Sequence, residues 1–138
     1  MSLNRGKIFQ KVLQMNNGSS IPQIGVGCYS IKNNHIFYES LKAGYRLFDS
    51  AGFYMNEKQI GDACRQAMKD FSIKREDIFV STKVPPNLYG KDKTLKSIER
   101  SLKLFDLEYI DMTLLLWPGG SGREQDPTEI QSLRKEAW

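Results

Sequence analysis

The feature that most constrains the fold is a repeating order of strand-like and helix-like segments along the chain. Apolar runs at 45–51 and 77–84 are each followed by a segment with apolar residues at helical spacing, at 56–71 and 93–107. With the flanking segments, the pattern amounts to four strand-then-helix units, which predict parallel strands joined by right-handed crossovers. The sequence therefore predicts an α/β fold. Periodicity alone leaves open whether the sheet is an open, doubly wound one or part of a (β/α) barrel.

The two longer helical segments each carry a stripe of apolar residues that we expect to face the core. In the first, the later members follow the first by four, seven, eight and eleven residues, the spacing of an amphipathic helix. The stripe residues are Ile60, Cys64, Ala67, Met68 and Phe71 in the first helix, and Leu95, Ile98, Leu102 and Phe105 in the second.

Turn and capping residues mark the ends of further elements near the N-terminus. Two short apolar runs flank Asn17 and Gly18, and Pro22 closes the second run, which predicts an N-terminal β-hairpin. The segment 33–44 begins with two asparagines suited to capping and ends at Gly44, which is typical of a short helix.

The C-terminal part of the chain continues the alternation. Residues 109–118 form a nearly continuous apolar run stopped by Pro118, which predicts a strand buried on both faces. The segment 127–138 then begins another helical pattern.

The composition limits the class of protein. A hydrophobic share of 40% and a charged share of 26% are ordinary for a soluble domain. The net charge of +4 comes from 20 basic and 16 acidic residues that are interspersed, which is weak support for nucleic-acid binding. No apolar stretch approaches the roughly 20 residues of a membrane span, and the N-terminus lacks a secretory pattern. We therefore expect one cytoplasmic domain over 1–138, with no nucleic-acid or membrane partner.

Two cysteines, Cys28 and Cys64, are the only ones in the chain, and no histidine lies near them at metal-ligand spacing. We expect reduced thiols and no metal site.

Three ionisable residues fall where strands end and the following loops begin. Asp49 lies near the end of the strand-like segment 45–51, Tyr54 follows five residues later, and Lys83 lies at the end of the strand at 77–84. Because the carboxyl ends of parallel strands meet at one rim, we expect the three side chains to converge there. Lys83 would offset the cost of placing the Asp49 carboxylate in a half-buried position.

The same ammonium, placed near a tyrosine hydroxyl, would stabilise the phenolate and so suit Tyr54 to act as a general acid. Taken singly, the tyrosine reads as an ordinary surface residue and the Lys83–Asp49 pair as a structural salt bridge. Residues alone leave a functional site and a structural cluster as alternatives.

The segment "GYRLFDSAGFYMNEKQIG" resembles the signature of the aldo-keto reductase family, which runs from Gly-Tyr-Arg to a catalytic Asp, a Tyr, Asn-Glu and a helix glycine. "SIKREDIFVSTKV" is similar to the family's third strand with its catalytic lysine, and "SLKLFDLEYIDMTLLLWP" to its third helix and fourth strand. "MNNGSSIPQIGVGCYS" is similar to its bottom-closing hairpin and first strand. The likeness spans roughly residues 12–138 in the family's order and spacing.

The resemblance implies the first half of a TIM (β/α)₈ barrel and an NADPH-dependent reduction of an aldehyde or ketone. The nicotinamide would deliver hydride to the carbonyl carbon while Tyr54 protonates the oxygen, with Lys83 and Asp49 tuning the tyrosine. For Cys28 the alternatives are an oxidation-sensitive thiol and a packing role. By resemblance, the cofactor-binding residues are Gly27, Cys28, Tyr29 and Asp49, and the substrate-binding residues are Tyr29, Leu116 and Trp117.

The sequence departs from the family pattern at one catalytic position. The family has a histidine directly before Trp-Pro at the end of the fourth strand, and Leu116 stands there in this chain. Leucine has no hydrogen-bond donor, so it cannot orient a carbonyl or stabilise developing charge on its oxygen. The only histidine, His35, lies before the first helix and reads as an ordinary polar residue.

The second departure is length, because a complete (β/α)₈ barrel needs about 250 residues and this chain has 138. We expect a half-barrel with open edge strands that promote self-association. The sequence leaves open a partial gene model, a truncated isoform and a protomer that pairs with another half. It also leaves open a catalytically impaired relative that acts as a binding or interaction module.

Overall fold

A four-stranded parallel sheet organises the structure. The computed structural model describes residues 11–117 and Lys135. Within this part of the chain the strands of the sheet lie side by side in sequence order, and each pairs in parallel with the next. They are β3 (Gly25–Gly27), β4 (Leu47–Asp49), β5 (Phe79–Val84) and β6 (Met112–Leu115).

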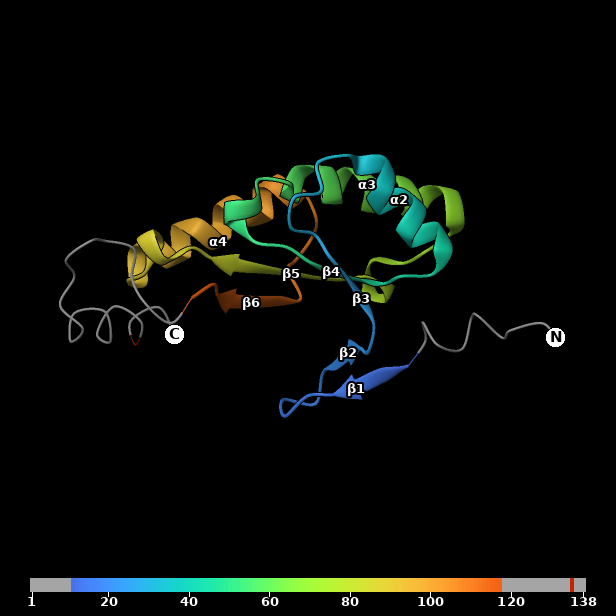
Figure 1. Ribbon diagram of the computed structural model, residues 1–138. Helices are drawn as coiled ribbons and strands as arrows, with labels where there is room; N and C mark the ends of the chain where they lie inside the picture. The colour runs from blue at the N-terminus through green and yellow to red at the C-terminus, as the bar shows by residue number, and fades with distance from the viewer. Residues whose placement is uncertain (1–10, 118–134, 136–138) are drawn as a thin grey trace.

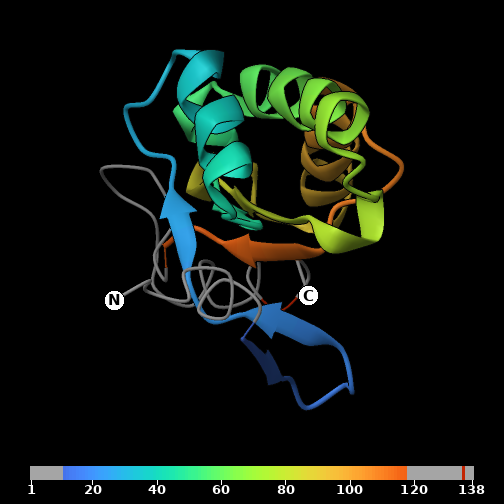
Figure 2. The ribbon, with the colours of Figure 1, turned by 90° about the vertical axis from the view of Figure 1, so that its right-hand side faces the viewer.

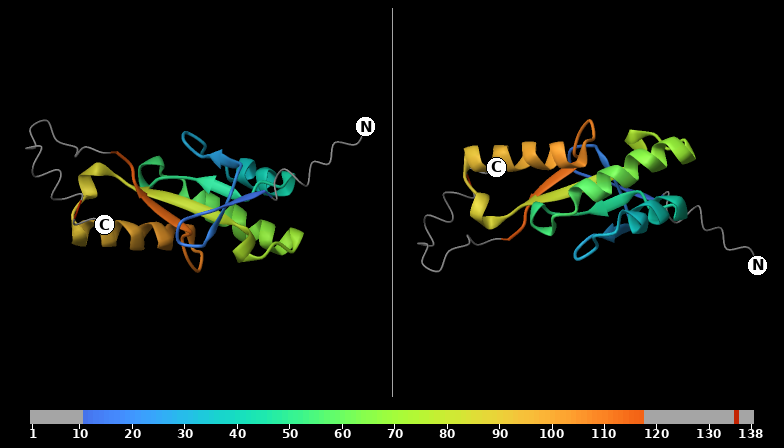
Figure 3. Two further views of the ribbon diagram at one scale, coloured as in Figure 1. Left: turned by 90° about the horizontal axis from the view of Figure 1, so that it is seen from below. Right: turned by 90° about the horizontal axis from the view of Figure 1, so that it is seen from above.

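Helices join successive strands and cover one face of the sheet. They are α2 (Asn34–Ala43), α3 (Glu57–Phe71) and α4 (Lys91–Phe105). Figure 1 shows all of them above the sheet, and α3 lies between α2 and α4 (Figures 2 and 3). The predicted α/β class and the parallel strand–helix order are therefore confirmed for the described residues. Among these residues, no helix has both the length and the apolar character that crossing a bilayer requires.

The ends of α2 follow from its capping residues. The Asn33 side chain accepts a hydrogen bond from the backbone N–H of His35 at 3.0 Å, which satisfies one free donor of the first turn. Gly44 adopts the left-handed conformation (φ 109°) and its N–H donates to the Leu41 carbonyl, which closes the last turn. The helix predicted for 33–44 is confirmed, including both ends.

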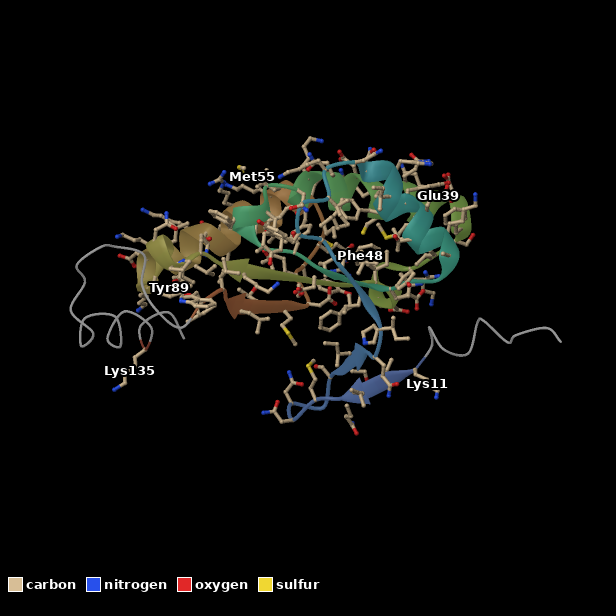
Figure 4. The ribbon with its side chains drawn as sticks, viewed as in Figure 1. Lys11, Glu39, Phe48, Met55, Tyr89 and Lys135 are labelled. Atoms are coloured by element: carbon tan, nitrogen blue, oxygen red, sulfur yellow. The ribbon has the colours of Figure 1, made fainter. Side chains whose placement is uncertain are left out.

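The core lies between the helices and the sheet. Phe37 of α2 packs edge to face on Phe48 of β4, with ring centroids 6.2 Å apart (Figure 4 labels Phe48). The stripe predicted for α3 is confirmed, because its apolar members all face this core. Ile60, Cys64 and Ala67 are buried, while Met68 and Phe71 are partly buried against the same cluster.

The stripe predicted for α4 is wrong at its first member. Leu95 is 52% exposed, and Ile98 and Leu102 are only half-buried. The side chains that α4 buries are mostly small and hydroxyl-bearing, and α4 packs on α3, on β5 and on the short 3-10 helix η3 (Pro86–Leu88). Small side chains allow that close approach, and their hydroxyls can bond to backbone carbonyls. The buried residues are Thr94, Ser97, Ser101 and Phe105.

The predicted burial of the last strand is also wrong. All of β6 is only half-buried, because within the described residues it pairs with β5 alone and forms an edge of the sheet. The helical pattern expected at 127–138 lies outside the described residues.

The hairpin predicted at the N-terminus is confirmed. The strands β1 (Val12–Gln14) and β2 (Ser20–Pro22) pair in antiparallel fashion. Gly18 supplies the positive φ of 83° that the turn needs. In Figure 1 the hairpin lies on the side of the sheet opposite the helices.

The amino ends of β5 and β6 are held by a nearly buried ion pair. Arg75, in the 3-10 helix η2 (Arg75–Asp77), donates to Asp111 at 2.7 Å, and their side chains are 10% and 15% exposed. The same Asp111 oxygen accepts from the Val80 N–H at 2.9 Å, and the guanidinium lies 3.9 Å from the Tyr109 ring centroid. These contacts set the register at the end of the sheet away from the candidate site.

A close helix contact joins α3 to α4. A Cβ added at Gly61 would lie 1.8 Å from the Phe105 carbonyl oxygen, so only glycine fits without movement of a backbone. The Arg65 guanidinium donates to the Phe105 and Asp106 carbonyls at 2.7 and 2.8 Å. These bonds satisfy carbonyls that are left free at the end of α4.

Replacing this glycine tests the helix contact. Gly61→Ala is expected to lower the free energy of unfolding by about 2 kcal/mol, because the methyl group forces α3 and α4 apart. In a helix without that contact, the same change would raise the free energy of unfolding by about 1 kcal/mol, so the two cases differ in sign. Urea unfolding followed by circular dichroism measures the change. The control Lys69→Ala, at an exposed position of α3, is expected to leave the midpoint nearly unchanged.

Candidate active site

The candidate site lies at the carboxyl ends of the strands, on the sheet face opposite the helices. Phe48 and Val80 face the helical core. Since side chains alternate along a strand, Asp49, Ser81 and Lys83 face the other way. The parallel register pairs Asp49 with Ser81, which brings the polar residues of β4 and β5 together.

The Asp49 carboxylate is the centre of a hydrogen-bonded cluster. Its Oδ1 accepts from Lys83 Nζ at 2.6 Å and from Ser81 Oγ at 2.7 Å. Lys83 Nζ also donates to the Ser50 carbonyl at 2.9 Å. The predicted contact between Lys83 and Asp49 is confirmed, and Ser81 is a member that the sequence analysis missed.

The sequence analysis expected the Asp49 carboxylate to be the group whose burial is costly, but the lysine is buried more deeply. The Lys83 side chain is 14% exposed and the Asp49 side chain 41%, so the cation is the more enclosed partner. Desolvation disfavours a charged amine, and the carboxylate and carbonyl oxygens around Nζ offset that cost. Asp49 therefore holds the lysine in place as much as the lysine holds the aspartate.

Tyr54 joins this cluster through its ring. It is half-buried at the end of the 3-10 helix η1 (Gly52–Tyr54), which directly follows β4. Lys83 Nζ lies 5.4 Å from the centroid of the Tyr54 ring, within the range of a cation–π contact. Within residues 11–117, the lysine donates to Asp49 and Ser50 and makes no hydrogen bond to the tyrosine hydroxyl. The structure thus brings the three predicted residues to one rim, with the ammonium over the aromatic ring.

Exposed apolar and aromatic side chains, with free space at the end of β3, surround Tyr54. Tyr29, 68% exposed, packs edge to face on the Tyr54 ring with centroids 5.2 Å apart. Phe53 is 65% exposed and Met55, labelled in Figure 4, is 72% exposed. A Cβ added at the exposed Gly27 would meet no atom within 4 Å, so there is free space beside the end of β3.

Cys28 lies beneath this surface. Its side chain is fully buried, and its thiol donates to the Val26 carbonyl at 3.4 Å. Burial, followed by the nearby Asp49 charge, raises the pKa of the thiol from 9.0 to about 12. The thiolate is the reactive form of cysteine, so this environment favours the packing role over the oxidation-sensitive one.

Leu116 and Trp117 follow β6 at the same rim, one strand beyond Lys83. The Leu116 N–H donates to the Val84 carbonyl at 3.0 Å, which extends the strand pairing, and the leucine is half-buried. Trp117 is 65% exposed, but both of its backbone polar groups bond to the hydroxyl of Tyr89, which is labelled in Figure 4. That hydroxyl accepts from the Trp117 N–H at 3.0 Å and donates to its carbonyl at 2.5 Å. The sequence analysis assigned no role to Tyr89.

Asn56 connects the loops that carry the candidate residues. Its side chain is fully buried, donates to the carbonyls of Cys28 and Ile31 at 2.7 and 2.9 Å, and accepts from Ser50 Oγ at 2.7 Å. One amide thus fixes the ends of β3 and β4 to the start of α3. The nearby Glu57, 2% exposed, accepts a bond of 2.5 Å from Thr82 of β5. The Asn-Glu pair of the family signature, which is Asn56 and Glu57 here, was the sequence signal that could have indicated these buried contacts.

The described residues contain no group of three or more His, Cys, Asp or Glu side chains placed to hold a metal ion.

Comparisons with known proteins place these residues in one family. The model of the Aldo/keto reductase family matches residues 32–131. An NAD(P)H-dependent D-xylose reductase from Pachysolen tannophilus is 41% identical over 105 residues, which cover 75% of this chain and 33% of that protein. A glycerol 2-dehydrogenase (NADP(+)) from Saccharomyces cerevisiae is 40% identical over 125 residues, or 88% of this chain and 37% of that protein. The chain spans about a third of the length of these curated relatives.

Solved structures agree with this match. An aldo/keto reductase from Brucella melitensis is 35% identical and superposes with a TM-score of 0.79, over 93% of this chain and 46% of that one. The aldose reductase from Schistosoma japonicum is also 35% identical, with a TM-score of 0.77 over 85% of this chain and 40% of that one. The parallel sheet with helices on one face accordingly corresponds to part of a TIM barrel.

The buried thiols predict low chemical reactivity in the native protein. Burial raises the pKa of both Cys28 and Cys64 from 9.0 to about 12, which lowers the thiolate fraction roughly 10³-fold at neutral pH. An aromatic disulfide reagent is expected to label the native chain slowly and the urea-unfolded chain quickly. Because unfolding releases the thiols to ionise near pH 9.0, stability is expected to decline as the pH rises from there toward 12. Rapid labelling of a thiol in the folded chain would contradict the predicted low reactivity of the two cysteines.

Proposed function

Because the chain belongs to the aldo/keto reductase family, we propose that its rim carries out the proton transfer of a nicotinamide-dependent reduction of aldehydes or ketones to alcohols. The relatives named above are an NAD(P)H-dependent D-xylose reductase and an NADP(+) glycerol 2-dehydrogenase, and both names pair a nicotinamide cofactor with a small polyhydroxylated substrate. The observation that carries the proposal is the contact of Lys83 with both Asp49 and the Tyr54 ring.

Tyr54 is the proton donor in this proposal. A carbonyl substrate bound at the rim would accept the phenol proton on its oxygen as its carbon receives a hydride, so that the product is the alcohol. The phenol is left as a phenolate, and the Lys83 ammonium stabilises that negative charge. Asp49 and the Ser50 carbonyl accept hydrogen bonds from the ammonium and hold it in place, and Ser81 donates to the same Asp49 oxygen.

The cofactor proposed for this site is NADPH, which would supply the hydride. The rim has features that suit a planar ring and its ribose. Gly27 leaves open space beside β3, Tyr29 presents an exposed aromatic ring, and Asp49 keeps a partly exposed carboxylate that can accept from a hydroxyl. Cys28 would contribute packing beneath this surface, because its side chain is buried. On the substrate side, Tyr29, Leu116 and Trp117 would line the approach to the tyrosine.

A second candidate function has one observation in its favour. Leu116 occupies the position where the family pattern has a histidine, and a leucine at the end of β6 offers no donor to the carbonyl oxygen. Losing such a donor typically lowers the rate on the order of 10²- to 10³-fold. The alternative is therefore an impaired or inactive relative that keeps the fold and binds a nucleotide or a partner.

A titration followed by a turnover assay separates the two functions. NADPH fluorescence is followed as the purified 138-residue chain is added, and consumption of NADPH is then measured with nitrobenzaldehyde. Binding together with aldehyde-dependent consumption supports the reductase. Binding without consumption supports the alternative, and absence of both at high micromolar protein rejects the proposed activity for this chain.

Removing the Tyr54 hydroxyl is the direct test of the proton donor. Tyr54→Phe is expected to abolish aldehyde reduction while NADPH binding persists, because the ring and its contact with Lys83 remain. Tyr38→Phe is the matched control, since it removes a hydroxyl of α2 that donates to Asp70 of α3 and takes no part in the rim. Unchanged kcat in Tyr54→Phe would remove Tyr54 from the mechanism.

Restoring a donor at the end of β6 tests the role of Leu116. Leu116→His is expected to raise kcat with nitrobenzaldehyde by roughly 10- to 10³-fold, because the imidazole can donate to the carbonyl oxygen. Leu95→His places the same residue on the exposed flank of α4 and is expected to change nothing. A histidine at 116 that leaves kcat unaltered would show that this position does not limit the reaction.

A further inference from the structure

Lys32 makes an unusual pair of contacts with the segment that carries Tyr54. It lies in the loop between β3 and α2, 22 residues before the tyrosine in sequence. Its Nζ donates to the Tyr54 carbonyl and, at 3.4 Å, to the Met55 carbonyl. A single ammonium from a separate loop therefore binds two successive backbone carbonyls at the end of η1.

The backbone at these carbonyls needs such support. Met55 is in the left-handed region (φ 51°, ψ 43°), which costs free energy for a residue with a side chain. The only further backbone bond seen at Tyr54 within the described residues runs from its N–H to the Ala51 carbonyl at 2.9 Å. Without Lys32, the turn that follows the tyrosine would lose its charged partner on the outer side.

Among the described residues, no carboxylate pairs with Lys32. Within residues 11–117 it forms no salt bridge, whereas Lys42, in the last turn of α2, pairs with Glu39 at 3.6 Å. The Lys32 charge is thus directed at carbonyl dipoles. Hydrogen bonds with a charged donor are stronger than neutral ones, so this contact can select one backbone conformation.

The position of the Tyr54 ring depends on that conformation. Asn56, directly after Met55, is fixed by its buried amide, so the segment 52–55 is held between an inner anchor and the outer ammonium of Lys32. Between these anchors the ring contacts Lys83 at 5.4 Å and Tyr29 at 5.2 Å. Loss of either anchor would let the ring move relative to the amine.

We infer that Lys32 is a positioning residue for the proposed proton donor: it clamps the backbone of Tyr54 and Met55 so that the phenol stays beside Lys83. The inference rests on the proposed function, because positioning matters for rate only if Tyr54 transfers the proton. Misplacement of a reacting group by about 1 Å can cost on the order of 10²-fold in rate.

The kinetic test uses Lys32→Met, which keeps the length of the side chain and removes the charge. Its kcat is expected to fall roughly 10- to 10²-fold while its KM for NADPH changes less than about twofold. Lys32→Arg retains a donor for both carbonyls and is expected to restore most of the rate. Lys42→Met is the control for loss of an exposed lysine and should match the wild type. Thermal unfolding verifies that each variant is folded.

A spectroscopic test stands independently of turnover. In protein labelled with ¹³C at the tyrosine ring, the Tyr54 resonance is assigned by its loss in Tyr54→Phe. Lys32→Met is expected to shift the Tyr54 and Tyr29 resonances and to leave that of Tyr109, at the other end of the sheet, in place.

The two tests separate failure of the inference from failure of the function. If the wild type turns over but Lys32→Met keeps its full rate and its tyrosine resonances, the positioning role is overturned. If no chain turns over and the resonances still shift, the clamp is supported and only the proposed reaction fails. Unshifted resonances overturn the clamp in either case.

Discussion

The hydrogen bonds that converge on Asp49 are the interaction on which the candidate site depends. One carboxylate oxygen accepts from both Lys83 and Ser81, and the lysine is the more enclosed partner. An enclosed ammonium is stable only with oxygen ligands around it. Those ligands come from β4 and from the residue after it, while the lysine comes from β5, so the parallel pairing of the two strands is a condition for placing the charge. The position of the charge in turn determines where the ammonium lies relative to the Tyr54 ring.

Around this cluster, the rim is assembled mainly through backbone groups. Asn56 binds the carbonyls of Cys28 and Ile31, Lys32 binds those of Tyr54 and Met55, and the Tyr89 hydroxyl binds both backbone groups of Trp117. Such contacts place the loops without constraining their exposed side chains. The outward-facing residues can therefore vary in chemistry while the frame that presents them stays the same, which is how one barrel rim supports different substrates in related enzymes.

The sequence predicted an element correctly where interactions within a few residues of one another determine its geometry. The caps of α2 at Asn33 and Gly44 and the hairpin at Gly18 depend on backbone geometry within a few residues, and the structure has all of them. The α4 stripe failed at Leu95 because which flank of a helix is buried depends on its neighbours, and here those neighbours accept small hydroxyl residues. The apolar run at 109–118 predicted a strand buried on both faces, but within the described residues the strand it contains, β6, lies at the edge of the sheet and is half-buried.

The sequence by itself determined the α/β order, both ends of α2 and the resemblance to its family. It also determined that Asp49, Tyr54 and Lys83 gather at one rim, because strand polarity places every strand end on the same side. Only the tertiary structure decided how those groups meet. It placed the ammonium over the tyrosine ring, enclosed the lysine more than the aspartate, buried Cys28 and brought Lys32 to the turn after Tyr54. These outcomes depend on contacts between segments distant in sequence, and spacing along the chain carries no measure of such distances.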